Sequence, residues 1–82
     1  MASEEIIKTQ IEQLVGGEYS KWTIGITEDP LDSKARHGNP LTWCHWKAES
    51  SETAHKIKKY FLQKGMQSGG KETNSAIFVY VF

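Results

Sequence analysis

Basic side chains are concentrated in the middle of the 82-residue chain. Residues 31–65 carry seven Lys or Arg against three Asp or Glu, whereas residues 1–30 carry two lysines against six carboxylates, so a formal net charge of zero conceals an acidic and a basic part. Such a basic part either pairs with the acidic part within the fold or binds a polyanion such as nucleic acid. If this part binds a polyanion, the residues expected to contact its phosphates are Lys34, Arg36, His37, Lys56, Lys58 and Lys59.

Two tryptophans lie three positions apart in an alternating aromatic segment. Because successive side chains of a strand point to opposite faces, Trp43 and Trp46 are expected on opposite sides of a sheet, with one of them accessible. Single-strand binders stack bases on accessible rings flanked by cations, which contributes about 1–3 kcal/mol per base. His45, Lys47 and Arg36 suit that role. The favoured interpretation is ordinary packing, with one ring in the core and the other covering a neighbouring helix.

The segment Thr23-Ile24-Gly25-Ile26-Thr27, followed ten residues after its last threonine by His37, resembles the second half of the GIY-YIG nuclease signature. In that family a strand with a Tyr-Ile-Gly-x-Thr pattern leads into a short helix bearing an arginine, and a later helix supplies a metal-binding glutamate. The segment Ala54-His55-Lys56-Ile57-Lys58 falls where this later helix would lie. The resemblance covers about residues 22–65. It implies a GIY-YIG-like core in which the strand glycine lets a backbone or a phosphate approach closely. The resemblance therefore adds Gly25 to the residues expected to contact nucleic acid.

Three positions depart from the pattern of that family. Thr23 stands in place of the tyrosine, Asp32 and Ser33 stand where the arginine is expected, and Lys58 replaces the glutamate. Mg²⁺ requires oxygen ligands, which a lysine ammonium group does not provide. The resemblance therefore implies a core that binds nucleic acid without cutting it.

The first strand of the family's hairpin is also missing upstream of Trp22. Val79-Tyr80-Val81 is able to supply that pairing partner from the other end of the chain. A metal-dependent nuclease that uses Glu49 or Glu52 as a displaced ligand is the less favoured alternative.

Neither a metal ion nor a nucleotide cofactor is expected. Cys44 and His45 are adjacent on a strand and point to opposite faces, so they cannot hold one ion together. The segment from Gly65 to Lys71 matches a G-x-x-x-x-G-K phosphate loop by count, but it follows a helix, precedes a strand and continues with Glu72 instead of a hydroxyl residue. The sequence therefore predicts no cofactor, no metal site and no catalytic residue.

Capping residues, glycine stops and hydrophobic periodicity predict a small α+β fold. The expected helices span 3–15, 30–37 and 51–64, and the expected strands span 21–27, 41–47 and 76–82. We expect a three-stranded antiparallel sheet in which the two later strands are both neighbours of the first, covered by the N-terminal helix and the 51–64 helix. The apolar residues of the C-terminal strand separately favour placing it, instead of the first strand, in the middle of the sheet, because they make it hazardous at an exposed edge.

The 51–64 helix is expected to bury Ala54, Ile57 and Phe61. Its outer face then presents a set of basic side chains to solvent, namely His55, Lys56, Lys58, Lys59 and Lys64. Residues 65–75, which include three glycines, are expected to form a loop.

A single domain over residues 1–82 is expected from this length. One cysteine excludes an internal disulfide and favours the reducing cytoplasm, and no apolar run approaches the roughly 20 residues of a membrane span. The expected function is a non-catalytic nucleic-acid-binding module with DNA or RNA as partner and no membrane contact. A small protein-interaction or homodimerisation module, in which the basic and acidic parts pair between chains, is the alternative.

Overall fold

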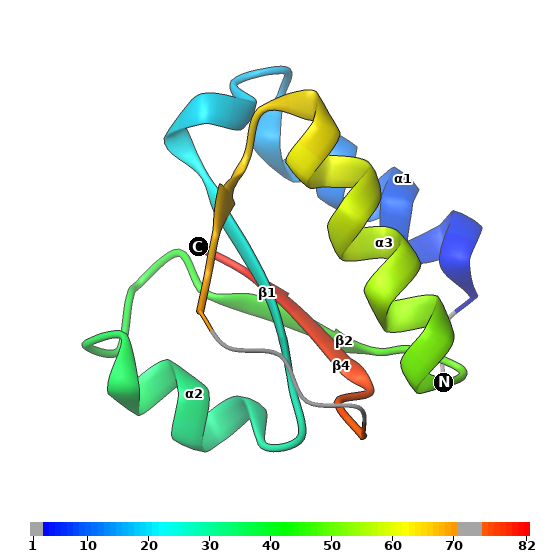
Figure 1. The fold of residues 1–82 in the computed structure, drawn as a ribbon. Coiled ribbons are helices and arrows are strands. Elements are labelled where there is room, and N and C mark those ends of the chain that lie inside the picture. Colours follow the sequence, from blue (N-terminus) through cyan, green and yellow to red (C-terminus); the bar gives the residue numbers. More distant parts are fainter. Residues whose placement is uncertain (1–2, 71–74) are drawn as a thin grey trace.

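A four-stranded mixed sheet lies between α1 and α3 on one side and α2 on the other (Figure 1). The computed structural model describes residues 3–70 and 75–82. The elements in chain order are helix α1 (Glu4–Val15), a 3₁₀ turn (Tyr19–Lys21), strand β1 (Thr23–Thr27), helix α2 (Pro30–Arg36), strand β2 (Cys44–Lys47), helix α3 (Ser51–Lys64), strand β3 (Gln67–Ser68) and strand β4 (Phe78–Val81). The predicted α+β class is confirmed.

Side-chain caps and glycines set the helix ends close to the predicted positions. Ser3, Asp29 and Ser50 each accept a hydrogen bond from the backbone N–H three residues later, at 3.3, 3.1 and 3.1 Å. Gly16 and Gly65 end α1 and α3 with φ angles of 58° and 113°, a left-handed conformation that glycine adopts without steric cost. The local signals in the sequence were therefore sufficient for the helices.

Strand β4 lies in the interior of the sheet, whose order is β2-β4-β1-β3. It pairs antiparallel with β1, with Gly25 opposite Tyr80, and antiparallel with β2, with His45 opposite Tyr80. The predicted central place of the C-terminal strand is thus confirmed. The predicted contact between the 41–47 strand and β1 is wrong, because β4 lies between β1 and β2. Both edges of β4 are therefore paired.

The other edge of β1 pairs with a strand that the sequence did not indicate. Gln67 and Ser68 form β3, parallel to β1, within the segment predicted to be a loop. Both side chains are exposed, so no hydrophobic alternation marks this strand. Its pairing makes the sheet mixed and four-stranded, where three antiparallel strands were predicted. Residues 71–74 of the predicted loop lie outside the described residues.

The main core fills the space between the sheet and the pair α1 and α3. Buried aliphatic side chains of β1 and β4 meet the buried stripes of the two helices, and the largest of these fully buried side chains are Ile7, Ile11, Ile24, Ile57, Phe61, Val79 and Val81. Side chains alternate along each strand, so the neighbouring positions of β1 and β4 point to the opposite side, where α2 lies.

At Gly25 of β1, the ring of Tyr80 from β4 lies so close to the backbone that it leaves no room for a side chain. A Cβ atom at this position would lie 2.3 Å from both Cζ and Oη of Tyr80. Only a residue without a side chain therefore lets the Tyr80 ring lie flat across β1.

We expect Gly25→Ala to lower the free energy of unfolding by about 1–3 kcal/mol, because the added methyl group displaces the Tyr80 ring. In a Tyr80→Leu background the same substitution should cost clearly less, since the ring atoms that it meets are gone. Urea unfolding of the four proteins of this double-mutant cycle measures the coupling. Equal costs of Gly25→Ala in both backgrounds would contradict the assigned contact.

Removal of residues 79–82 should abolish cooperative unfolding. The deletion takes away a strand paired on both edges, together with buried side chains worth about 1.5–3 kcal/mol each, against a total stability of about 5–15 kcal/mol. The matched control is Phe82→Ala, which keeps the backbone hydrogen bonds of 2.8 and 3.0 Å to Thr23 and should remain folded. Amide dispersion in a proton–nitrogen correlation spectrum is the measurement, and a dispersed spectrum from the deletion would show that β4 is dispensable.

Candidate nucleic-acid interface

A row of aromatic side chains lies on the sheet face opposite α1 and α3. Strand β4 and the residue after it contribute three of them, β2 and the residue before it contribute two, and the end of α2 contributes one. The members of this row, hereafter the aromatic strip, are His37, Trp43, His45, Phe78, Tyr80 and Phe82.

The rings in the middle of the aromatic strip are nearly parallel. Trp43 and Tyr80 stack with centroids 4.4 Å apart and an interplanar angle of 13°, and Trp43 and Phe82 lie 5.7 Å apart at 17°. The indole N–H of Trp43 donates a 3.0 Å hydrogen bond to Nδ1 of His45. Ring packing and this hydrogen bond together restrict the orientation of Trp43 before any ligand arrives.

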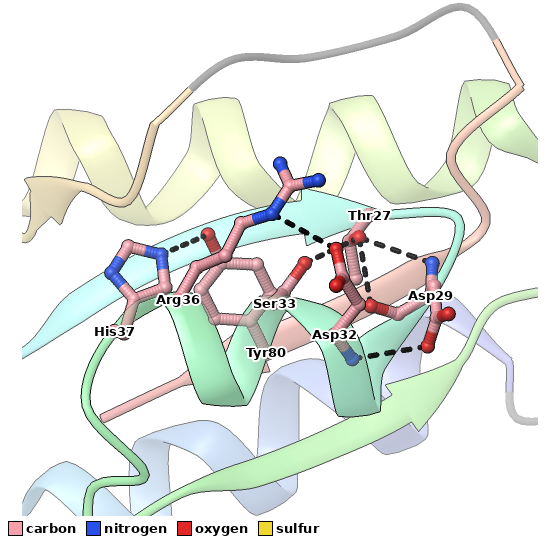
Figure 2. Close-up of polar contacts among 7 residues, drawn as sticks. All are labelled: Thr27, Asp29, Asp32, Ser33, Arg36, His37 and Tyr80. Atoms are coloured by element: carbon pink, nitrogen blue, oxygen red, sulfur yellow. Dashed lines mark hydrogen bonds and ion pairs between the residues drawn. The ribbon is translucent and has the colours of Figure 1, made fainter.

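Tyr80 forms the base of the aromatic strip, since only 3% of its surface is exposed. Its hydroxyl donates a 2.8 Å hydrogen bond to the carbonyl of Gly69, and it lies 3.2 Å from Nε2 of His37 (Figure 2). Because the Tyr80 hydroxyl donates its proton to the Gly69 carbonyl, its oxygen acts as the acceptor toward His37, and the Nε2–H of His37 is the donor. Trp43, Phe78 and Phe82 are half-buried and both histidines are exposed, so the strip presents ring edges and faces to solvent.

A groove of about 480 Å³ adjoins the aromatic strip. It lies between α2 and the segment after β3, and its lining comprises Ile26, Thr27, Glu28, Asp29, Asp32, Ser33, Arg36, His37, Gly69, Gly70 and Tyr80. Asp29, Asp32, Ser33 and Arg36 follow the spacing of one helical face, which is why a single short helix supplies most of its polar side chains.

Hydrogen bonds fix this helix against the end of β1. Thr27 Oγ1 accepts a hydrogen bond of 2.6 Å from the Ser33 hydroxyl and one of 3.1 Å from the Asp29 N–H (Figure 2). On the same helical face, Nε of Arg36 lies 2.9 Å from Oδ2 of Asp32, an ion pair that is largely exposed.

The structure brings only part of the predicted contact residues together. Arg36 and His37 line the groove, and Lys34 lies on the same helix without lining it. Gly25 is buried beneath the Tyr80 ring, so the space left by its missing side chain is filled by that ring and is closed to a phosphate. The sequence correctly indicated a close approach at this glycine but not the group that makes it.

The predicted exposure of Lys58 is wrong. This side chain is 2% exposed, and its Nζ lies 3.5 Å from the carbonyl oxygen of Gly70. Ala54, Ile57 and Phe61 are buried on the same helix, and position 58 lies four residues after the first and three before the last of them. The aliphatic stem of Lys58 therefore continues the buried stripe while its ammonium group reaches a polar edge.

Lys56 and Lys59 are exposed on α3, which lies across the sheet from α2. The seven predicted residues thus do not share one surface. The aromatic strip replaces them as the candidate interface, and its signal was present in the sequence. Phe78, Tyr80 and Phe82 alternate with apolar residues of the other face, but the pattern alone did not indicate that this face is partly open.

The predicted separation of Cys44 from His45 agrees with the structure. Cys44 packs against the core on the side of α1 and α3, whereas His45 belongs to the aromatic strip. Within residues 3–70 and 75–82, no group of three or more His, Cys, Asp and Glu is placed to hold a metal ion. The helices in this part of the chain are all too short or too polar to cross a membrane.

No protein-family model, curated protein or solved structure matches the chain. The interpretation of the site therefore depends on its geometry.

Burial raises the pKa of the Tyr80 phenol above its ordinary value of 10.0. The folded protein then holds this proton more tightly than the unfolded chain, so the stabilisation is complete below pH 10.0 and is lost as the pH rises through the raised pKa. We expect the wild-type free energy of unfolding to fall more steeply above about pH 10 than that of Tyr80→Phe. Urea unfolding across this range checks the expectation, and parallel curves for the two proteins would refute it.

Proposed function

We propose that the protein binds single-stranded DNA or RNA, without cleaving it, by stacking bases on the aromatic strip. The observation that carries the proposal is the pair of half-buried, nearly parallel rings of Trp43 and Phe82 on the sheet face away from α1 and α3. Bases of any sequence offer a flat π surface to such rings. Tyr80 beneath them and the hydrogen bond to His45 hold the platform rigid, which lowers the entropic cost of binding.

Cations beside the aromatic strip are suited to contact the phosphates. Lys47 is exposed on β2 opposite Phe78, on the same face of the sheet, while Arg36 and Lys34 lie on α2. Three phosphate contacts to a single strand correspond to a slope of log K against log salt of about −2. The salt dependence is thus weaker than six basic residues on one face would give, because Lys56 and Lys59 lie on the other side of the sheet and do not contribute phosphate contacts.

We also propose that the core is a permuted, degenerate GIY-YIG domain. The pairing of Val79-Tyr80-Val81 with the Thr23–Thr27 strand supports this proposal, because it supplies from the C-terminus the hairpin strand that is missing upstream. Lys58, at the position of the metal-binding glutamate, is buried against the Gly70 carbonyl. The groove lining includes neither Glu49 nor Glu52, which disfavours the alternative of a displaced metal ligand and an active nuclease.

Charge reversal on the two sides of the sheet tests where nucleic acid binds. We expect Arg36→Glu with Lys47→Glu to weaken binding of a labelled single-stranded oligonucleotide at least about tenfold at low salt, because two attractions become repulsions. The matched control, Lys56→Glu with Lys59→Glu, changes the net charge equally on α3 and should change affinity much less. Fluorescence anisotropy measures both, and equal losses would indicate nonspecific charge attraction without a defined face.

Trp43→Ala should remove about 1–3 kcal/mol of stacking energy, a roughly 5- to 150-fold loss of affinity for single strands. The loss should persist at high salt, since stacking is not screened as phosphate contacts are. If the wild-type protein shows no salt-sensitive affinity for DNA or RNA, the proposed function falls. The aromatic strip would then suit a protein partner or a second copy of the chain, which sedimentation of the purified protein would detect.

A further inference from the structure

The groove and the aromatic strip form one continuous surface. His37 and Tyr80 belong to both, and their rings lie 5.6 Å apart with the imidazole hydrogen-bonded to the phenol. The His37 ring also lies 4.7 Å from that of Phe82, so a strand that crosses Trp43 and Phe82 passes next to the groove. Its volume of about 480 Å³ lies within the roughly 300–1,000 Å³ that is typical of sites for small organic ligands.

The charge of the lining distinguishes which part of a nucleotide fits inside. Among the described residues of the lining, Glu28, Asp29 and Asp32 contribute three carboxylates, against one guanidinium from Arg36. A phosphate inside the groove would meet net repulsion, whereas a neutral base would not. Arg36, whose side chain is 77% exposed, lies toward the solvent side and suits the phosphate that remains outside.

Asp32 is the carboxylate best placed to contact a base. The ion pair of 2.9 Å with Arg36 restrains its orientation, yet 51% of its side chain stays exposed. Asp29 is less available, because one of its oxygens caps α2 through the N–H of Asp32. A carboxylate accepts hydrogen bonds and donates none, so it favours a base edge that carries an exocyclic amino group over one that carries only carbonyls.

We propose that the groove holds one base of the bound strand and selects a base with an exocyclic amino group, which donates to the carboxylate of Asp32. The inference rests on the proposed binding of single strands to the aromatic strip. The groove would then make binding depend on the identity of one base, whereas stacking on the aromatic strip does not depend on sequence. Tyr80 and His37 form the aromatic floor of this position, and the Ser33 hydroxyl lies on its helical wall.

The test uses short thymine oligonucleotides in which one central base is guanine, hypoxanthine, adenine or purine. Hypoxanthine and purine lack only the exocyclic amino group of guanine and adenine, so stacking is nearly matched within each pair. We expect the wild-type protein to bind the amino-bearing member of at least one pair about tenfold more tightly, as a hydrogen bond to a charged group allows. This comparison needs no variant and is independent of any effect on folding.

Asp32→Ala should reduce that preference to about onefold, because alanine has no side-chain oxygen to accept a hydrogen bond from the amino group. Loss of a negative charge strengthens binding of every strand by a similar factor, so the ratio within each pair is the readout. The matched control is Glu12→Ala, which likewise replaces an exposed carboxylate by alanine, but on α1, across the sheet, and should keep the wild-type ratio.

The outcomes separate the two proposals. Tight, salt-sensitive binding with equal affinities within both pairs would overturn the base site and leave the proposed function standing. A preference that survives Asp32→Ala would equally overturn the assignment of this carboxylate. Absence of binding to any of the oligonucleotides would overturn the proposed function, and the base site with it.

Discussion

The close approach of the Tyr80 ring to the backbone of Gly25 is the constraint on which the rest of the structure depends. The ring lies across β1 because Gly25 has no side chain, and its hydroxyl then reaches the carbonyl of Gly69 at 2.8 Å. That hydrogen bond and the 2.7 Å bond from the Gly69 N–H to the Ile24 carbonyl hold the chain beside β1 directly after β3. One small residue thus allows a phenol from the last strand to fasten the only parallel pairing of the described sheet.

The alternation of side chains along the strands gives the sheet two chemically different faces, and this contact lies on one of them. On the side of α1 and α3, Ile24, Ile26 and Val79 are buried and contribute hydrophobic stabilisation in the usual way. On the other side the sheet is covered by rings in contact with one another. There α2 is joined to β1 by the hydrogen bond from Ser33 to Thr27, and the His37 ring that follows α2 packs on Tyr80 and Phe82. A face closed by stacked aromatic rings stays partly accessible, so it stabilises the sheet and remains available to a ligand.

Lys58 illustrates how position and residue type conflict. The spacing from Ala54, Ile57 and Phe61 places it within the apolar stripe of α3, whereas its charge favours solvent. The long stem resolves the conflict, because its methylene groups pack with the stripe while the ammonium group approaches the Gly70 carbonyl. Counting charges along a helix therefore overestimates its basic surface whenever a lysine occupies a core-facing position.

Local sequence determined the helices and most strands of this protein. Caps at Ser3, Asp29 and Ser50 act through hydrogen bonds to nearby backbone, and the alternation of residues 76–82 reflects the two-residue period of a strand, so both can be identified without knowing the fold. The central place of the C-terminal strand also followed from its apolar composition.

Tertiary structure alone decided which neighbour each strand has, that Gln67 and Ser68 form a strand, and which predicted site residues share a surface. These features depend on contacts between residues far apart in the chain, such as Tyr80 with Gly25 and with His37. The periodicity of the sequence shows that two sets of side chains occupy opposite faces of a strand. Only the packing of α1, α2 and α3 around the sheet decides which face becomes the core and which keeps its rings within reach of solvent.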